Sequence, residues 1–290
     1  MPLPVTFILF PALMVFVQPL AGAAAADSQT TGDADAIYEA GRASYKGEGT
    51  ARDFVKAAGL FRKAAEAGHM KAQTDFGAMY VGGRGVGKDL AEATKWFLQA
   101  AGQGDASAML NLGWMALEGL GADRNAAVGI DWYRKAAEAG LAEAQSRLAD
   151  LYFWGRNGVE KDLPEAARWF EKAALQGVAS AQNTLGVMLE TGEGAAKDPA
   201  KAVRFFRAAA EQGDARAQMN LGRMLANGIG VERDLNAACY WFVLSINGKE
   251  PSGEKRMEEL ALEGRVTLKQ IAEARILAAT FVPKPRKPFR

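Results

Sequence analysis

A block of about 36 residues occurs six times along the chain, and this repetition limits the fold more than any other feature of the sequence. Each block opens with a small residue, at Ala36, Ala72, Ala108, Ala144, Ala181 and Ala217. A glycine follows eleven residues later, at Gly47, Gly83, Gly119, Gly155, Gly192 and Gly228. Because one such unit cannot bury its own apolar face, the units must stack side by side. The repetition therefore predicts a solenoid.

Each unit has the pattern of a helical hairpin. In the second unit, apolar residues recur at helical spacing over 72–80, and a glycine loop at 82–85 ends that helix. Asp89 then stands where a helix N-cap is needed, and 93–101 carries the apolar stripe of a second helix. The same capping place is held elsewhere by Asp53, Asn125, Asp162, Asp198 and Asp234. Paired aromatic residues recur in the second helix, for example Trp132-Tyr133, Trp169-Phe170 and Trp241-Phe242.

One unit departs from this spacing. The loop 155–158 of the fourth unit holds one residue more than its counterparts, so Asn157 is interpreted as an insertion in a surface loop. After it the repeat resumes at Asp162. The glycine-rich stretch 82–88 resembles a phosphate-binding loop, but Asp89 follows it where a hydroxyl is needed, and the repeat accounts for its glycines.

The first 26 residues contain no charged side chain, and Val5–Val17 is a mainly apolar run. This run is shorter than the roughly 20 residues of a membrane-spanning helix. The alanines at 24–26 form an A-x-A cleavage site, so we expect a signal peptide at 1–26 and a periplasmic or secreted protein without stable membrane insertion. The leader has no Lys or Arg near its start, which leaves an uncleaved anchor as the alternative.

The remaining segments differ in composition. The sequence predicts a disordered stretch at 27–35, the repeats at 36–249, two capping helices within 250–282 with Thr267 as an N-cap, and a basic, proline-rich tail at 283–290. That tail is either a frayed end or a docking arm.

Charge and residue counts argue against several functions. The net charge of +1 argues against a broad nucleic-acid or membrane-binding face, and we expect a monomer. The single cysteine, Cys239, excludes an internal disulfide. His69 is the only histidine and is interpreted as an exposed turn residue. We therefore expect no catalytic residues, no metal and no cofactor.

The order of residues within a unit points to a known family. It runs small residue, Leu-Gly, large apolar residue, Gly-x-Gly-Val, Asp, Ala, two aromatics, Lys-Ala-Ala and Gly. This order resembles the Sel-one-like repeat family, a relative of the tetratricopeptide repeats. The resemblance implies an all-α fold, a right-handed α-solenoid whose first helices line a concave groove. It also implies an adaptor that holds another protein, in bacterial envelopes often in signalling, secretion or polysaccharide export. The alternative is a cell-wall or β-lactam-directed hydrolase, as among cysteine-rich relatives, but their units pair cysteines and this chain has one.

A candidate groove follows from helical periodicity. The third, seventh, tenth and eleventh positions of each unit, counted from its opening alanine, lie opposite the core stripe, yet many hold large apolar residues. A contiguous strip of such residues favours a protein interface. Its candidate residues are Tyr38, Arg42, Leu110, Trp114, Leu117, Glu118, Asp150, Phe153, Trp154 and Arg223. The alternative is that neighbouring first helices bury several of these side chains against one another.

Overall fold

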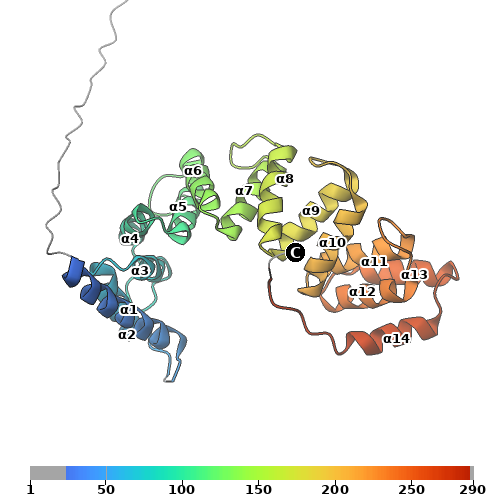
Figure 1. Ribbon diagram of the computed structural model, residues 1–290, viewed down its shortest axis with the longest axis horizontal. Coiled ribbons are helices and arrows are strands. Elements are labelled where there is room, and N and C mark those ends of the chain that lie inside the picture. The colour runs from blue at the N-terminus through green and yellow to red at the C-terminus, as the bar shows by residue number, and fades with distance from the viewer. Residues whose placement is uncertain (1–23, 50, 288–290) are drawn as a thin grey trace, which may run out of the picture.

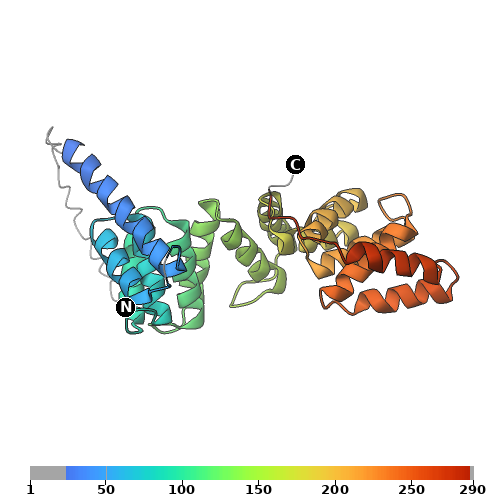
Figure 2. The same cartoon turned by 90° about the horizontal axis from the view of Figure 1, so that it is seen from below.

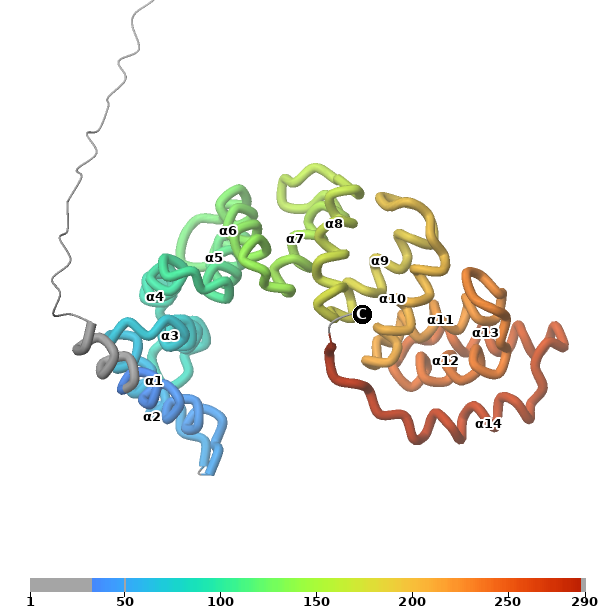
Figure 3. The backbone as a smooth tube through the Cα atoms, in the orientation of Figure 1, coloured from blue at the N-terminus to red at the C-terminus, as the bar shows by residue number. Residues whose placement is uncertain are grey.

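The chain is described by a computed structural model over residues 24–49 and 51–287, with side chains from residue 33 onward. This part of the chain contains fourteen helices and no strand, which confirms the all-α solenoid (Figure 1). The first helices of the hairpins, here the A helices, are α1 (Ala24–Lys46), α3 (Met70–Gly82), α5 (Ala106–Glu118), α7 (Ala142–Trp154), α9 (Ala179–Thr191) and α11 (Ala215–Asn227). The second, or B, helices are α2 (Phe54–Glu66), α4 (Leu90–Gly102), α6 (Ala126–Glu138), α8 (Leu163–Leu175), α10 (Pro199–Glu211) and α12 (Leu235–Asn247). The hairpins follow one another along an arch, as the tube in Figure 3 shows.

The ends of the helices are fixed by the residues that the repeat places there. The Asp89 carboxylate accepts hydrogen bonds from the backbone N–H groups of Ala91 and Glu92, which satisfies two donors at the start of α4. At the end of α3, Gly83 takes the left-handed conformation with φ 62° and returns its N–H to the Met79 carbonyl. Aspartate or asparagine caps the other B helices in the same way, at Asp53, Asn125, Asp162, Asp198 and Asp234.

Packing between the two helices of a hairpin depends on a glycine in the A helix. A Cβ atom at Gly222 would lie 2.7 Å from the ring of Phe242, so only glycine lets α12 approach α11 this closely. Phe242 is buried, as are Phe97, Phe170 and Phe206 at the same place in other B helices. Each buried aromatic ring contributes about 2–3 kcal/mol. The glycine of the Leu-Gly pair is therefore the position against which the second aromatic residue of the B helix packs.

The apolar core is divided along the stack. One large cluster runs from the end of α6 through α12 into the C-terminal helices, and smaller clusters lie within α1–α4 and α4–α6. A third small cluster joins Leu117, Tyr133 and Leu151. Consecutive helices pack against each other along the whole solenoid. Stability therefore comes from neighbour-to-neighbour contacts rather than from one central core.

The structure differs from the sequence prediction at the amino-terminal end. Residues 27–35, predicted to be disordered, lie within the bounds of α1, which begins at Ala24. The polar composition suggested disorder, but the preceding alanines have the highest helix propensity of any residue. The expected leader at 1–26 lies almost entirely outside the described residues.

The insertion at Asn157 changes how its loop contacts the preceding repeat. In the second repeat, Gly85 lies against the start of α2, and a Cβ atom there would be 2.0 Å from the Phe54 carbonyl oxygen. Gly158 is the counterpart in the fourth repeat, yet nothing lies within 4 Å of its Cβ position. Asn157 itself has a φ of 58° and accepts a hydrogen bond from the Arg124 guanidinium of the third repeat. In the fourth repeat, a side-chain hydrogen bond between Arg124 and Asn157 thus replaces the close backbone contact that Gly85 makes in the second repeat.

Two further helices follow the repeats, α13 (Ser252–Leu262) and α14 (Leu268–Ala278), and α14 packs against α12. Thr267 caps α14 through a capping box with Gln270. The tail then folds back along the repeats instead of fraying, at least as far as Lys287 (Figure 2). Within the described residues, none of the helices has the length and apolar character that crossing a bilayer requires.

Candidate protein-binding face

The A-helix face is the set of A-helix positions that point away from the core stripe. Trp114 on α5 and Trp154 on α7 lie on this face, with exposed fractions of 38% and 57%. The tryptophans of the B helices at Trp96, Trp169 and Trp241 are all buried. Two large exposed rings on neighbouring A helices give the third and fourth repeats an apolar surface that solvent can reach.

Side chains around Trp154 hold its ring in place. The ring meets Phe153 edge to face with a centroid separation of 4.8 Å, and the Arg156 guanidinium lies 5.2 Å from its centroid. Phe153 in turn meets the buried ring of Phe170 at 6.0 Å. Trp154 is therefore an exposed ring that its neighbours already hold in place. Its side chain loses little conformational freedom when a partner binds.

Acidic groups flank the exposed rings. Glu118 at the end of α5 and Asp150 on α7 are exposed at the surface. Partial burial of the carboxyl group raises the pKa of Asp150, while the charges of Arg147 and Arg156 act in the opposite direction. The face around α5 and α7 thus combines apolar rings with carboxylates, the composition of an interface centre with a polar rim.

Two of the predicted groove residues are buried and belong to the core. Leu117 is 5% exposed and packs with Tyr133 and Leu151. Tyr38 is 8% exposed, and its hydroxyl donates to the Asp75 carboxylate at 3.0 Å. The prediction of an exposed groove position is wrong for both, because each side chain packs against the second helix of its own hairpin and against the next repeat.

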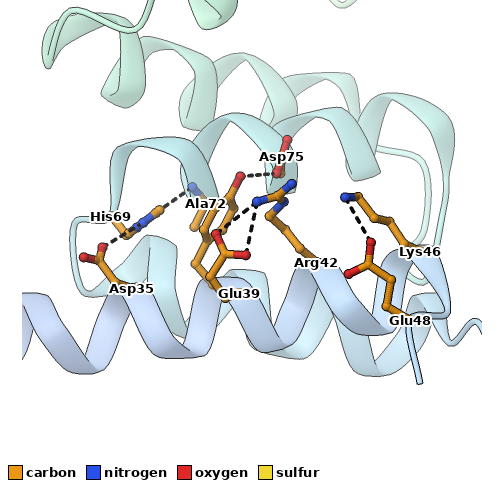
Figure 4. Close-up of polar contacts among 9 residues, drawn as sticks. Asp35, Glu39, Arg42, Lys46, Glu48, His69, Ala72 and Asp75 are labelled. Carbon is orange, nitrogen blue, oxygen red and sulfur yellow. Dashed lines mark hydrogen bonds and ion pairs between the residues drawn. The ribbon is translucent and has the colours of Figure 1, made fainter. Parts of the chain in front are cut away.

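The first two repeats carry a polar network in place of exposed rings (Figure 4). The Tyr38 ring stacks on His69 with a centroid separation of 4.4 Å. His69 Nδ1 accepts a hydrogen bond from the Ala72 N–H at 2.9 Å, and its Nε2 lies 3.1 Å from the Asp35 carboxylate. The ring proton therefore sits on Nε2. His69 is the N-cap of α3 with a side chain 13% exposed, which corrects the interpretation as an exposed turn residue.

Arg42 lies beside this network and does not offer a free charge. Its guanidinium bonds to the Glu39 carboxylate at 3.0 Å and lies 5.8 Å from the Tyr38 ring. Burial raises the pKa of Asp75. This effect outweighs the hydrogen bond from Tyr38 and the charge of Arg42, both of which lower the pKa. This part of the face is a set of satisfied polar contacts between α1 and α3.

The last two repeats are joined by polar pairs across the A-helix face. Arg223 on α11 makes two parallel hydrogen bonds to the Glu190 carboxylate on α9, one of them at 2.7 Å. The Asn220 amide donates to the Asn183 side chain at 2.9 Å. The predicted groove residue Arg223 therefore links two repeats.

The structure divides the ten predicted residues into groups. Exposed are Trp114, Glu118, Asp150 and Trp154; half-buried are Arg42, Leu110, Phe153 and Arg223; buried are Tyr38 and Leu117. The polar partners Asp75, Glu190 and Asn183 were missed. A comparison of facing positions would have found them, because Tyr38–Asp75 and Asn183–Asn220 are each separated by 37 residues, about one repeat.

Comparison with known proteins identifies the repeat. The model of the Sel1 repeat matches residues 34–69, 71–105, 106–141, 142–178, 179–214 and 215–248. No protein with a curated description matches the sequence.

Two solved structures are similar over most of the chain. The Sel1 repeat protein from Oxalobacter formigenes is 30% identical, with a TM-score of 0.64 over 86% of this chain and 98% of that one. The protein c5321, a protective antigen of uropathogenic Escherichia coli strains that displays an SLR fold, is 31% identical with a TM-score of 0.54. The match covers 88% of this chain and 62% of c5321, so the chain spans less than two thirds of that protein's length.

Proposed function

The chain belongs to the Sel1 repeat family, and from this premise we propose that it is an adaptor that binds another protein through the A-helix face of α5 and α7. Sel1 repeats are protein-interaction modules that typically act as non-catalytic scaffolds. The observation that carries the proposal is the pair of exposed rings at Trp114 and Trp154, because the four tryptophans of the B helices are buried or, at Trp132, half-buried. Exposed aromatic anchors on a rigid support are typical of interface centres.

The alternative, a cell-wall or β-lactam-directed hydrolase of the cysteine-rich repeat type, receives no support, because such relatives pair cysteines within their units and this chain has only Cys239. Cys239 is buried in α12, and this burial raises the pKa of its thiol. A thiol in apolar surroundings is a poor nucleophile.

Photocrosslinking tests the binding face. A photoreactive amino acid placed at position 154 or 118 should capture the same partner protein in intact cells. Matched positions at Leu98 on α4 and Leu175 on α8, which are also exposed apolar residues but belong to B helices, should give no adduct. Equal yields of the same adduct from both sets of positions would show that the A-helix face has no special role.

We further propose that the protein is exported and that its leader is removed close to Asp27. This proposal rests on the uncharged apolar leader and the alanines at 24–26. Sequencing the amino terminus of protein recovered from the cell envelope tests it. A mature terminus within a few residues of Asp27 is expected, whereas intact Met1 on membrane-bound protein would assign the leader as an anchor.

A further inference from the structure

The C-terminal tail is bound to the repeats by specific contacts. The Lys284 backbone N–H donates to the Glu211 carbonyl at 2.8 Å, and the Lys284 ammonium lies 2.9 Å from the Glu211 carboxylate. Two residues further on, Arg286 Nε donates to the Gln176 carbonyl at 3.0 Å. The tail leaves α14 and runs back to the ends of α10 and α8 (Figures 1 and 2). The chain therefore supplies an example of how these repeats bind an extended basic segment.

The tail binds at turns between a B helix and the next A helix. The last carbonyls of a helix have no partner within the helix, and they form the negative end of its dipole. The tail satisfies such carbonyls with an N–H group and places Lys284 and Arg286 at the negative ends of α10 and α8. The glycines of these turns leave room for it. A Cβ atom on Gly213 would lie 3.2 Å from the Pro283 side chain. A Cβ atom on Gly177 would lie 2.1 Å from the Lys287 carbonyl oxygen.

The spacing of the tail matches the spacing of the repeats. Pro283 and Pro285 favour an extended polyproline conformation, which rises about 3.1 Å per residue. Two to three residues then cover about 6–9 Å, close to the 8–10 Å between packed helices. Lys284 accordingly reaches one turn and Arg286 the next. A basic residue after each proline is thus in register with the solenoid.

Three earlier turns have the same glycine conformation, and no segment of the described part of the chain is bound to them, although the turn at Gly104 has Gly102 where those at Gly68 and Gly140 have a glutamate. Gly68, Gly104 and Gly140 have φ values of 87°, 95° and 91°, close to the 84° and 91° of the two covered glycines. Nothing lies within 4 Å of a Cβ atom at any of the three. Glu66 and Glu138 stand two residues before their turn glycines, where Glu211 stands before Gly213, and both are exposed.

The turn at Gly68 also opens onto a pocket with an acidic rim. Asp35 and Glu39 of α1 line this pocket together with Gly68 and Lys71. The Asp35 and Glu39 side chains are largely exposed. Glu39 is paired with Arg42 and Lys71 adds a positive charge to the rim, so the Asp35 carboxylate and the negative end of α2 are the features of this pocket that favour a cationic ligand.

We propose that the open turns at Gly68, Gly104 and Gly140 bind an extended segment of a partner protein in which prolines alternate with lysine or arginine. The occupant is inferred from the chain's own tail, which binds equivalent turns, and from the exposed carboxylates at Glu66 and Glu138. This surface lies at the edge of the solenoid, apart from the A-helix face of α5 and α7. The inference goes beyond the proposed function and does not depend on it.

A peptide with the sequence of residues 280–287 is the direct probe. Fluorescence polarisation should show that the labelled peptide binds the full chain and is released by salt. The double variant Glu66→Lys/Glu138→Lys should weaken binding at least about fivefold, because each substitution places a positive charge beside the turn. The matched variant Glu193→Lys/Glu232→Lys, which changes exposed glutamates in loops at the other end of the hairpins, should bind as the parent does.

Several outcomes would overturn the proposal. Absence of binding would do so, as would equal weakening in the two double variants, which would indicate unspecific attraction between charges. If Glu211→Lys were the only variant that lost binding, the peptide would be displacing the bound tail and not binding the open turns. A concentration-dependent dimer in sedimentation, lost on Lys284→Ala/Arg286→Ala, would assign the turns to the tail of a second copy.

Two controls do not depend on the stability of any protein variant. A peptide with alanine in place of Lys284, Arg286 and Lys287 should not bind the unchanged chain. A photoreactive peptide should crosslink near residues 66–69, 102–105 and 138–141, and adducts confined to 175–178 and 211–214 would contradict the proposal. Neither readout involves Trp114 or Trp154, so this proposal and the proposed function can fail separately.

Discussion

At the scale of single residues, tryptophan burial separates the structural positions from the candidate binding positions. Four tryptophans lie on B helices at one place in the repeat, where Trp96, Trp169 and Trp241 are buried and Trp132 is half-buried. Trp114 and Trp154 lie on A helices and keep 38% and 57% of their surface exposed. Because an exposed aromatic ring gains little from folding, its energetic contribution is expected on binding.

A buried carboxylate predicts a pH dependence of stability. Burial raises the folded-state pKa of Asp75 above the ordinary value of an aspartate, so the folded state holds the proton up to a higher pH than the unfolded state. The free energy of unfolding should therefore fall as the pH rises from about 4 through the folded-state pKa, and should recover as the pH is lowered again. Asp75→Asn keeps an acceptor for the Tyr38 hydroxyl and removes this contribution.

Urea unfolding of the parent and of Asp75→Asn at a series of pH values measures the difference. We expect the variant to gain stability relative to the parent on going from pH 4 to pH 7. Asp150 and Asp214, whose pKa values are also raised by burial, remain in both proteins and cancel in the comparison. A constant difference across the range would contradict the assignment to Asp75.

At the scale of the helix pair, a buried glutamine ties four of the hairpins to the one before it. Gln182 at the start of α9 donates to the Ala174 carbonyl of α8 at 3.0 Å and accepts a hydrogen bond from Gln212 at the end of α10. Gln218 makes the same donor contact with Ala210, but its carbonyl oxygen is buried without a partner. The cause is Gly248, which occupies the position of Gln212 in the sixth repeat.

Because the Gln182 side chain makes one hydrogen bond more than that of Gln218, its substitution should cost more stability. Gln182→Met removes two hydrogen bonds, each with a net contribution of about 0.5–1.5 kcal/mol, and should cost about 1–3 kcal/mol of stability. Gln218→Met removes an acceptor that is already unpaired and should cost about 1 kcal/mol less. The third repeat has Met109 at this position, so the side chain fits the site. Chemical denaturation compares the two variants, and equal losses would show that the missing partner of Gln218 has no energetic effect.

The inserted residue is expected to be dispensable. Deletion of Asn157 loses its hydrogen bond with Arg124 but lets Gly158 approach the preceding repeat as Gly85 does. The two effects oppose each other, and the stability should change by less than about 0.5 kcal/mol. A residue inserted beside Ala173, which is fully buried in α8, should instead turn the apolar stripe of that helix out of the core. Thermal melts compare the variants, and similar losses would contradict this repeat register.

At the scale of the whole molecule, the sequence predicted what the repeat determines. Caps such as Asp89, turn glycines such as Gly83 and buried rings such as Phe242 recur at fixed spacing, so their roles could be assigned from the sequence alone. The exposure of Trp114 and Trp154 also followed from helical periodicity.

Contacts that depend on how neighbouring repeats meet could not be predicted in this way. Leu117 and Tyr38 occupy outward positions of a single helix, and they are buried between the second helix of their own hairpin and the next repeat. The salt bridge from Arg223 to Glu190 and the docking of Lys284 on Glu211 join residues from different units. Periodicity within one unit contains no information about such pairs, because they depend on the angle between hairpins.

The measurement that tests the binding account most directly compares stability and affinity in the same variants. Trp114→Ala and Trp154→Ala should each leave the melting curve almost unchanged and weaken the complex with the crosslinked partner by about 2 kcal/mol, roughly thirtyfold in Kd. Trp169→Ala should instead cost about 3–5 kcal/mol of stability. Leu98→Ala, which removes an exposed apolar side chain from a B helix, serves as the matched control and should bind as the parent does. Unchanged affinity in the two A-helix variants, or melting as early as that of Trp169→Ala, would contradict the assignment of this face as the binding site.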